Sequence, residues 1–102
     1  MQYRIEIRPE AHEDLKSIED WSLLNFGWET ALKTLDGLFR GMSRLKEFPD
    51  SGSLTPDKML NEAGYRMVIV GRHVIIYKVI GETVFVYRVL DTRRQYTRLF
   101  YE

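Results

Sequence analysis

Two glycine-containing turns in the second half of the chain constrain its fold most strongly. Gly71-Arg72 and Gly81-Glu82 separate three runs rich in β-branched and aromatic residues. Two-residue Gly-X connections suit type II′ hairpin turns, because glycine takes the required positive φ angle without a steric penalty. The pattern therefore predicts an antiparallel three-stranded meander, with strands at residues 65–70, 73–79 and 83–90.

The first half of the chain predicts one strand and a helical hairpin. Residues 3–8 alternate apolar and charged side chains, which is typical of a strand with one buried face. Apolar residues at helical spacing predict a helix over about residues 10–26, ended by Gly27, and a second from Trp28 to Phe48, ended by Pro49. The order β-α-α-β-β-β indicates an α+β fold in which the hairpin covers one face of a small curved sheet. The first strand can return to pair with the meander, and we also consider a short C-terminal helix.

Length and composition narrow the class of protein. We expect a single domain over residues 1–102, since a second core would leave each half too little surface to bury. The chain has no cysteine and its two histidines lie far apart, so we expect no disulfide, no metal site and no cofactor. Its apolar runs are far shorter than the roughly 20 residues of a membrane helix, and its start has no apolar signal core. We therefore expect a cytoplasmic protein with no membrane contact.

The zero net charge hides a division between the two halves. Residues 1–63 carry eight Lys and Arg against twelve Asp and Glu, whereas residues 64–102 carry seven against three. Six of those seven cations are arginines, whose planar fork binds phosphate or carboxylate at two points and stacks on bases. This distribution places the candidate functional surface in the strand-rich half. The alternative is that these arginines are solvated ends of strands and helices.

Arg88 stands out within the last predicted strand. Simple alternation puts it on the same face as Val84 and Val86, where a charge needs a partner or a ligand. Asp91 is one candidate partner. Further cations follow at the same end of the strand, and several tyrosines near them are suited to stacking on unpaired bases: Arg93, Arg94 and Arg98, with Tyr87, Tyr96 and Tyr101.

This cluster suggests a metal-free RNA-cleaving site, which needs a base, an acid and cations that stabilise charge on the phosphate. The arginines suit the cationic role. His73 titrates near neutral pH and is one candidate for proton transfer, with a structural role as the alternative; Tyr96 and Tyr101 are others. The acidic residues of the first helix are expected to be solvated and not part of the site: Glu13, Asp14, Glu19 and Asp20. Gly37 and Gly41, on the far side of the apolar stripe of the second helix, either admit a close neighbour, such as a partner backbone, or are surface positions.

A series of motifs in order along the chain resembles the RelE/ParE superfamily of toxins. The motifs lie at residues 3–11, Asp14-Leu15, residues 45–49, residues 64–66, Tyr77 and residues 88–96, so they cover nearly the whole chain. The resemblance implies the toxin half of a bacterial type II toxin–antitoxin module, including plasmid stabilisation or addiction modules, that arrests growth. It also implies an antitoxin partner that wraps and neutralises the toxin and connects it to operator DNA.

The resemblance leaves the mechanism open. RelE-like members cut mRNA on the ribosome, whereas ParE-like members inhibit DNA gyrase. By position, Arg66 and Arg88 match the strand arginines of the family, Arg93 and Arg94 its C-terminal basic pair, and Tyr96 an aromatic position.

Several features bear on the choice between these mechanisms. Arg-Val-Leu followed by an Arg-Arg pair is more ParE-like, although Arg8, Asp91 and Gln95 depart from that pattern. Zero net charge, and Lys58 as the only lysine of the loop before Gly64, disfavour docking on ribosomal RNA. The rich arginine and tyrosine cluster slightly favours mRNA cleavage by an endoribonuclease (mRNA interferase). Gyrase inhibition is the first alternative, and an inactive regulatory homologue that only binds antitoxin is the second.

Overall fold

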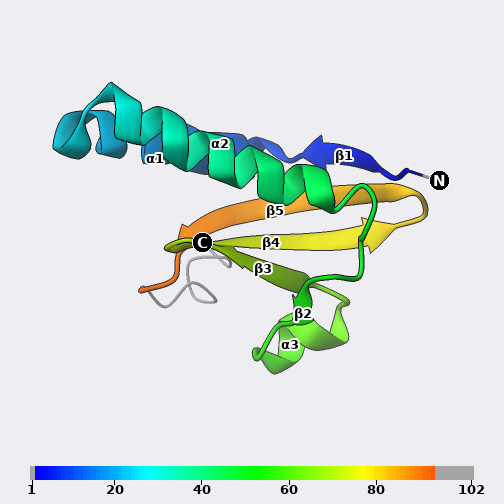
Figure 1. Ribbon diagram of the computed structural model, residues 1–102. Helices are drawn as coiled ribbons and strands as arrows, with labels where there is room; N and C mark the ends of the chain where they lie inside the picture. Colours follow the sequence, from blue (N-terminus) through cyan, green and yellow to red (C-terminus); the bar gives the residue numbers. More distant parts are fainter. Residues whose placement is uncertain (1, 94–102) are drawn as a thin grey trace.

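The computed structural model describes residues 2–93, and the structural statements below concern these residues. Two long helices run side by side along one face of a mixed sheet (Figure 1). The predicted α+β arrangement is confirmed, with β2 and α3 added inside the segment expected to be a loop. A C-terminal helix, Arg94 and Tyr96 lie outside the described residues. The elements are β1 (Arg4–Ile7), α1 (Pro9–Phe26), α2 (Trp28–Arg44), β2 (Ser53–Leu54), α3 (Lys58–Glu62), β3 (Arg66–Val70), β4 (His73–Ile80) and β5 (Thr83–Asp91).

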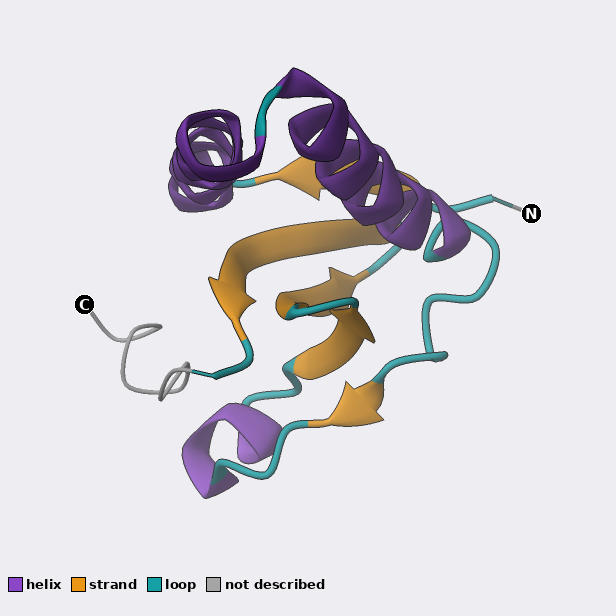
Figure 2. Ribbon diagram, turned by 60° about the vertical axis from the view of Figure 1, so that its left-hand side comes forward, coloured by secondary structure: helices purple, strands orange, loops and turns teal. Residues whose placement is uncertain are grey.

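The sheet has the strand order β1-β5-β4-β3-β2. β3, β4 and β5 form the predicted antiparallel meander, and Gly71 and Gly81 take the positive φ angles that its turns require, both +60°. β1 precedes the helical hairpin and pairs in parallel with β5, from Arg4 opposite Thr83 to Ile7 opposite Val86. Figure 2 shows the hairpin on one side of the sheet and α3 near β2 on the other. The helical hairpin of α1 and α2 therefore covers only one face of the sheet.

The main core lies between the helical hairpin and the sheet. Pro9 starts α1, and Gly27, with a φ of +89°, both ends α1 and precedes α2. α2 ends at Arg44, four residues before the predicted end at Phe48. Phe48 therefore lies outside the helix, and it is exposed to solvent. Burial of this apolar surface supplies most of the driving force for folding. The buried members of the core are Ala11, Leu15, Leu38, Met42, Leu45, Ile75, Tyr77, Val84, Val86 and Val89.

Tyr77 fixes the chain segment that follows α2. Its ring is fully buried, and its hydroxyl donates to the carbonyl of Pro49 (2.7 Å) and accepts from the N–H of Gly52 (2.9 Å). Burial raises the pKa of the Tyr77 hydroxyl, which keeps it protonated as a donor at neutral pH. A Cβ atom at Gly52 would lie 2.5 Å from this hydroxyl oxygen. Glycine is therefore required where the segment meets the sheet.

Gly37 and Gly41 of α2 face the sheet, so the prediction that they lie behind the apolar stripe is wrong. Both approach Val70 at the end of β3. A Cβ atom at Gly41 would lie 2.7 Å from Cγ2 of Val70 and 3.5 Å from Cδ1 of Ile75, whereas one at Gly37 would lie 3.8 Å from Cγ1 of Val70. The close neighbour that these glycines admit is thus the protein's own sheet.

This difference gives a prediction for two alanine variants. Gly37→Ala should raise the free energy of unfolding by about 0.5–1 kcal/mol, because alanine favours the helix and the new methyl group makes an ordinary contact. Gly41→Ala should be less stable than Gly37→Ala by about 1 kcal/mol or more, because the stiff Val70 side chain must move. Urea denaturation of both variants measures the difference. Equal gains would show that the spacing between α2 and β3 adjusts freely.

Candidate functional site

An irregularity in β5 determines the direction in which Arg88 points. Ile76 lies opposite Arg88 and Tyr77 lies opposite Val86, so Tyr87 is an extra residue in a β-bulge. Beyond the bulge the alternation reverses: Val89 packs in the core below the helices. The prediction that Arg88 shares a face with Val84 and Val86 is therefore wrong.

Arg88 binds a carboxylate of α1. Its Nε donates to Oδ2 of Asp14 at 2.7 Å and its Nη2 donates to Oδ1 at 3.0 Å, which makes the pair bidentate. Oδ2 also accepts from the N–H of Val89 at 2.9 Å, beyond the point where β1 ends its pairing with β5. The side chains of Arg88 and Asp14 are only 18% and 13% exposed. Arg88 has a charged partner, as expected, but the partner is Asp14 and not the candidate Asp91. The prediction that Asp14 is a solvated residue is also wrong.

Asp91 pairs instead with Arg93, two residues further along the chain. Oδ1 of Asp91 accepts from the backbone N–H (2.8 Å) and Nε (3.2 Å) of Arg93, and Oδ2 accepts from Nη2 (3.1 Å). The side-chain hydrogen bonds from Arg93 lower the pKa of Asp91 to about 2. The Arg93 side chain is 62% exposed, so this pair contributes little to folding stability.

His73 begins β4 and lies opposite Asp91 in the sheet register. The residue is only 8% exposed. Burial lowers the pKa of its imidazole, the nearby charges of Arg72 and Arg93 lower it further, and Asp91 opposes these effects. His73 is therefore a neutral imidazole at neutral pH.

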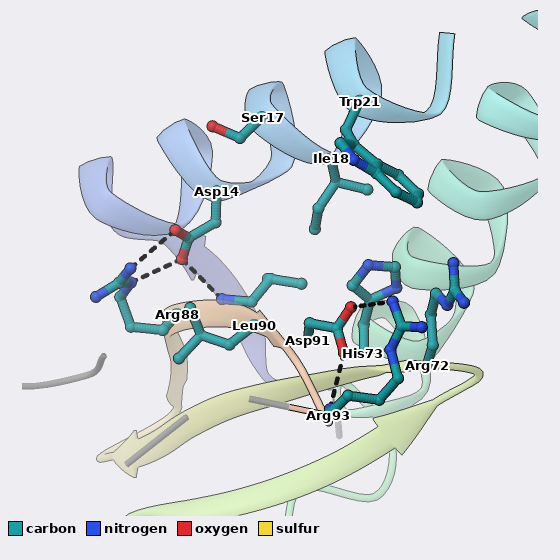
Figure 3. Close-up of a pocket in the computed structure, with 11 residues that line it drawn as sticks. Asp14, Ser17, Ile18, Trp21, Arg72, His73, Arg88, Leu90, Asp91 and Arg93 are labelled. Atoms are coloured by element: carbon teal, nitrogen blue, oxygen red, sulfur yellow. Dashed lines mark hydrogen bonds and ion pairs between the residues drawn. The ribbon is translucent and has the colours of Figure 1, made fainter. Parts of the chain in front are cut away.

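These side chains meet at a cavity of about 430 Å³ between α1 and the adjoining ends of β4 and β5. Figure 3 shows Asp14, Ile18 and Trp21 projecting from α1, and Arg72, Asp91 and Arg93 on the side of the sheet. The guanidinium of Arg72 lies 5.8 Å from the centre of a Trp21 ring. The lining residues are Asp14, Ser17, Ile18, Trp21, Arg72, His73, Arg88, Val89, Leu90, Asp91 and Arg93.

The cavity contains some of the predicted site residues and omits another. Arg88, Arg93 and His73 line it, whereas Arg66 does not. Nη1 of Arg66 donates to the carbonyl of Gly52 (2.9 Å), and its Nε lies 3.8 Å from Oδ1 of Asp50, so this side chain holds the segment after α2.

Arg94 and Tyr96 lie outside the described residues. Sequence reasoning missed Asp14, Arg72 and Trp21 as residues of the cavity. One sequence signal could have identified Arg72: the Gly-X hairpin turn places it beside His73 at the same end of the sheet.

Comparison with known families identifies the class of protein. Residues 5–96 match the family described as "ParE toxin of type II toxin-antitoxin system, parDE". The chain belongs to the ParE toxin family. This agrees with the superfamily that the sequence motifs resemble.

Solved structures show that the ParE-family toxin shares its fold with two toxin–antitoxin systems. "Chromosomal ParDE TA system from P. aeruginosa" matches with a TM-score of 0.75 at 20% identity, over 88% of this chain and 96% of that one. The toxin–antitoxin complex RelBE2 from Mycobacterium tuberculosis matches with a TM-score of 0.61 at 17% identity, over 89% and 99% of the two chains. No curated protein matches the toxin.

Residues 2–93 of the toxin contain no group of three His, Cys, Asp or Glu side chains placed to hold a metal ion. Nor do they contain a helix of the length and apolarity that crossing a membrane requires.

The contact between Asp14 and Arg88 gives a prediction for toxin stability. Asp14→Asn should lower the free energy of unfolding by about 2–4 kcal/mol, because it removes the negative charge that pairs with the largely buried guanidinium of Arg88. Urea denaturation measures the loss, and Glu13→Gln, an exposed neighbour on α1, is the matched control. If both variants lose the same amount, the ion pair does not hold α1 to β5.

The lowered pKa of His73 gives a prediction for pH dependence. The unfolded imidazole takes up its proton near pH 6.5, whereas the folded one does so only at lower pH. The free energy of unfolding should therefore fall as the pH drops below about 6.5, by at most about 1.4 kcal/mol per pH unit.

His73→Gln should flatten this decline between pH 7 and pH 5. His12→Gln, a change at an exposed histidine of α1, should leave the slope unchanged. Urea denaturation at a series of pH values provides the test. A slope that survives in His73→Gln would assign the effect to another group.

Proposed function

We propose that this toxin arrests growth by binding and inhibiting DNA gyrase in the cytoplasm, without cleaving RNA, and that an antitoxin neutralises it. The family match and the fold shared with two toxin–antitoxin systems support a toxin with an antitoxin partner. ParE-like members of the superfamily are the ones that the sequence resemblance connects with gyrase. We therefore favour gyrase inhibition over mRNA cleavage, the two mechanisms that the resemblance left open.

The observation that carries this choice is that the three described candidate arginines are engaged within the fold. Arg88 binds Asp14, Arg93 binds Asp91, and Arg66 binds the segment around Gly52. A site that cleaves a phosphodiester needs cations directed at the position where charge develops. Carboxylates already occupy the forks of Arg88 and Arg93, which supports a binding surface in preference to a nuclease site.

Proton transfer gives a second argument in the same direction. Cleavage needs a base and an acid that reach the reacting atoms. His73 is the one described residue of the cavity with an ordinary pKa near neutrality, and it is almost fully buried. The hydroxyl of Tyr77 is already bonded to Pro49 and Gly52. The described geometry thus favours the alternative over the mRNA cleavage that the arginine-rich sequence slightly favoured.

Parallel assays of supercoiling and RNA integrity test this proposal. Toxin made by cell-free synthesis is added to purified gyrase with relaxed plasmid, and separately to translating ribosomes whose mRNA ends are mapped. We expect supercoiling to fall as toxin is added, with unchanged mRNA ends, because blocking a protein surface requires no proton transfer. Toxin premixed with the protein encoded beside it is the control and should leave supercoiling intact.

Two other results would contradict the proposal. Codon-phased cuts in mRNA with normal supercoiling would establish the nuclease mechanism. Intact mRNA together with full supercoiling would establish the inactive, antitoxin-binding homologue.

A further inference from the structure

Arg72 differs from the other arginines of the cavity in what surrounds its charge. Its guanidinium packs against Trp21, and no carboxylate within residues 2–93 forms an ion pair with it. Its backbone is held firmly, because its carbonyl accepts from the N–H (2.9 Å) and the hydroxyl (3.1 Å) of Thr92. The turn between β3 and β4 therefore presents a cation from a fixed position. Stacking on an indole also orients a guanidinium and leaves its N–H edge available to a ligand.

The charges around the cavity specify the kind of ligand. Among residues 2–93, three arginines and two aspartates line it and His73 is neutral, so these side chains leave one positive charge. A phosphate dianion would bring two charges close to Asp14 and Asp91, whereas a single carboxylate matches the remaining charge. The other walls include Ile18, Trp21 and Val89, which suit the aliphatic stem of a side chain. Together these features fit a glutamate better than a phosphate dianion.

We propose that this cavity is the recognition pocket for a glutamate side chain of the toxin's protein target. Arg72 binds the carboxylate, and Trp21 packs against the methylene groups of the ligand. Arg93 lines the same cavity, with its guanidinium engaged by Asp91 (Figure 3). The assignment to the target rests on the proposed function, whereas the preference for a carboxylate rests on the cavity alone.

Nuclear magnetic resonance of the full chain tests the preference for a carboxylate without gyrase. Glutamate and glutamine, each capped with an N-acetyl group and an α-N-methylamide so that only the side chain differs in charge, and inorganic phosphate are titrated separately while the indole N–H of Trp21 and the Nε–H of Arg72 are followed. The only other tryptophan is Trp28, so Trp28→Phe assigns the indole signals. We expect saturable shifts with the capped glutamate, and about tenfold weaker binding or more in Arg72→Gln, because a charged hydrogen bond is lost.

Arg4→Gln is the matched control, because Arg4 is exposed and pairs at the other end of β5, opposite Thr83. This variant should bind the capped glutamate like the unaltered toxin. Equal shifts with the capped glutamine, or unchanged binding in Arg72→Gln, would overturn the proposal. Tighter binding of phosphate than of the capped glutamate would also overturn it and assign the cavity to a phosphate ligand.

The supercoiling assay tests the assignment to the target. Arg72→Gln should need about ten times more toxin for the same inhibition, with Arg4→Gln unchanged, and urea denaturation confirms that both variants fold. Inhibition by the unaltered toxin and by Arg72→Gln at equal concentrations would overturn the pocket while leaving gyrase as the target. Carboxylate binding by a toxin that does not inhibit gyrase would overturn the proposed function while supporting the pocket.

Discussion

One carboxylate, that of Asp14, connects the helical hairpin to the sheet and sets the geometry of the rest of the site. It receives two hydrogen bonds from Arg88 and one from the backbone of Val89. β1 has ended its pairing with β5 by this point, so a side chain of α1 satisfies a backbone group at the edge of β5. The contact holds α1 against the end of β5. The cavity lies just beyond it, between Trp21 of α1 and Arg72 of the β3–β4 turn.

The division of charge along the chain has a structural meaning that its net value conceals. The acidic first half and the basic second half neutralise each other across the fold, through Asp14 with Arg88 and Asp50 with Arg66. A buried bidentate pair of this kind fixes orientation more than it adds stability, because both ions lose their hydration. Two of the arginines that suggested a polyanion-binding surface, Arg88 and Arg66, are therefore used to position the hairpin and the segment after α2.

The sequence predicted those parts of the fold that depend on local signals. The glycine turns gave the meander, and the alternation in residues 3–8 gave β1. Asp57 is a recognisable cap for α3, since its side chain accepts from the N–H of Leu60, although the loop around it obscured the helix. The bulge at Tyr87 had no local signal, because residues 84–90 are apolar or aromatic apart from Arg88 and include no glycine. Without that bulge the turn at Gly81 would place His73 opposite Leu90; with it, Asp91 takes that position.

The site could be predicted less well than the fold, because its contacts join residues far apart in sequence. Arg88 and Asp14 are separated by 74 positions, and no pattern in either helix distinguished Asp14 from its solvated acidic neighbours. Within residues 2–93, the arginines that pattern and resemblance selected have partners inside the protein. Arg72, which the sequence presented as an ordinary turn residue, is the described arginine of the cavity that has no ion-pair partner in this part of the chain. A ligand can be discriminated there by the cost of bringing a second negative charge near Asp14 and Asp91, in addition to the attraction of Arg72. Selectivity of this kind requires fixed charges and a shaped wall, and it requires no group that transfers a proton.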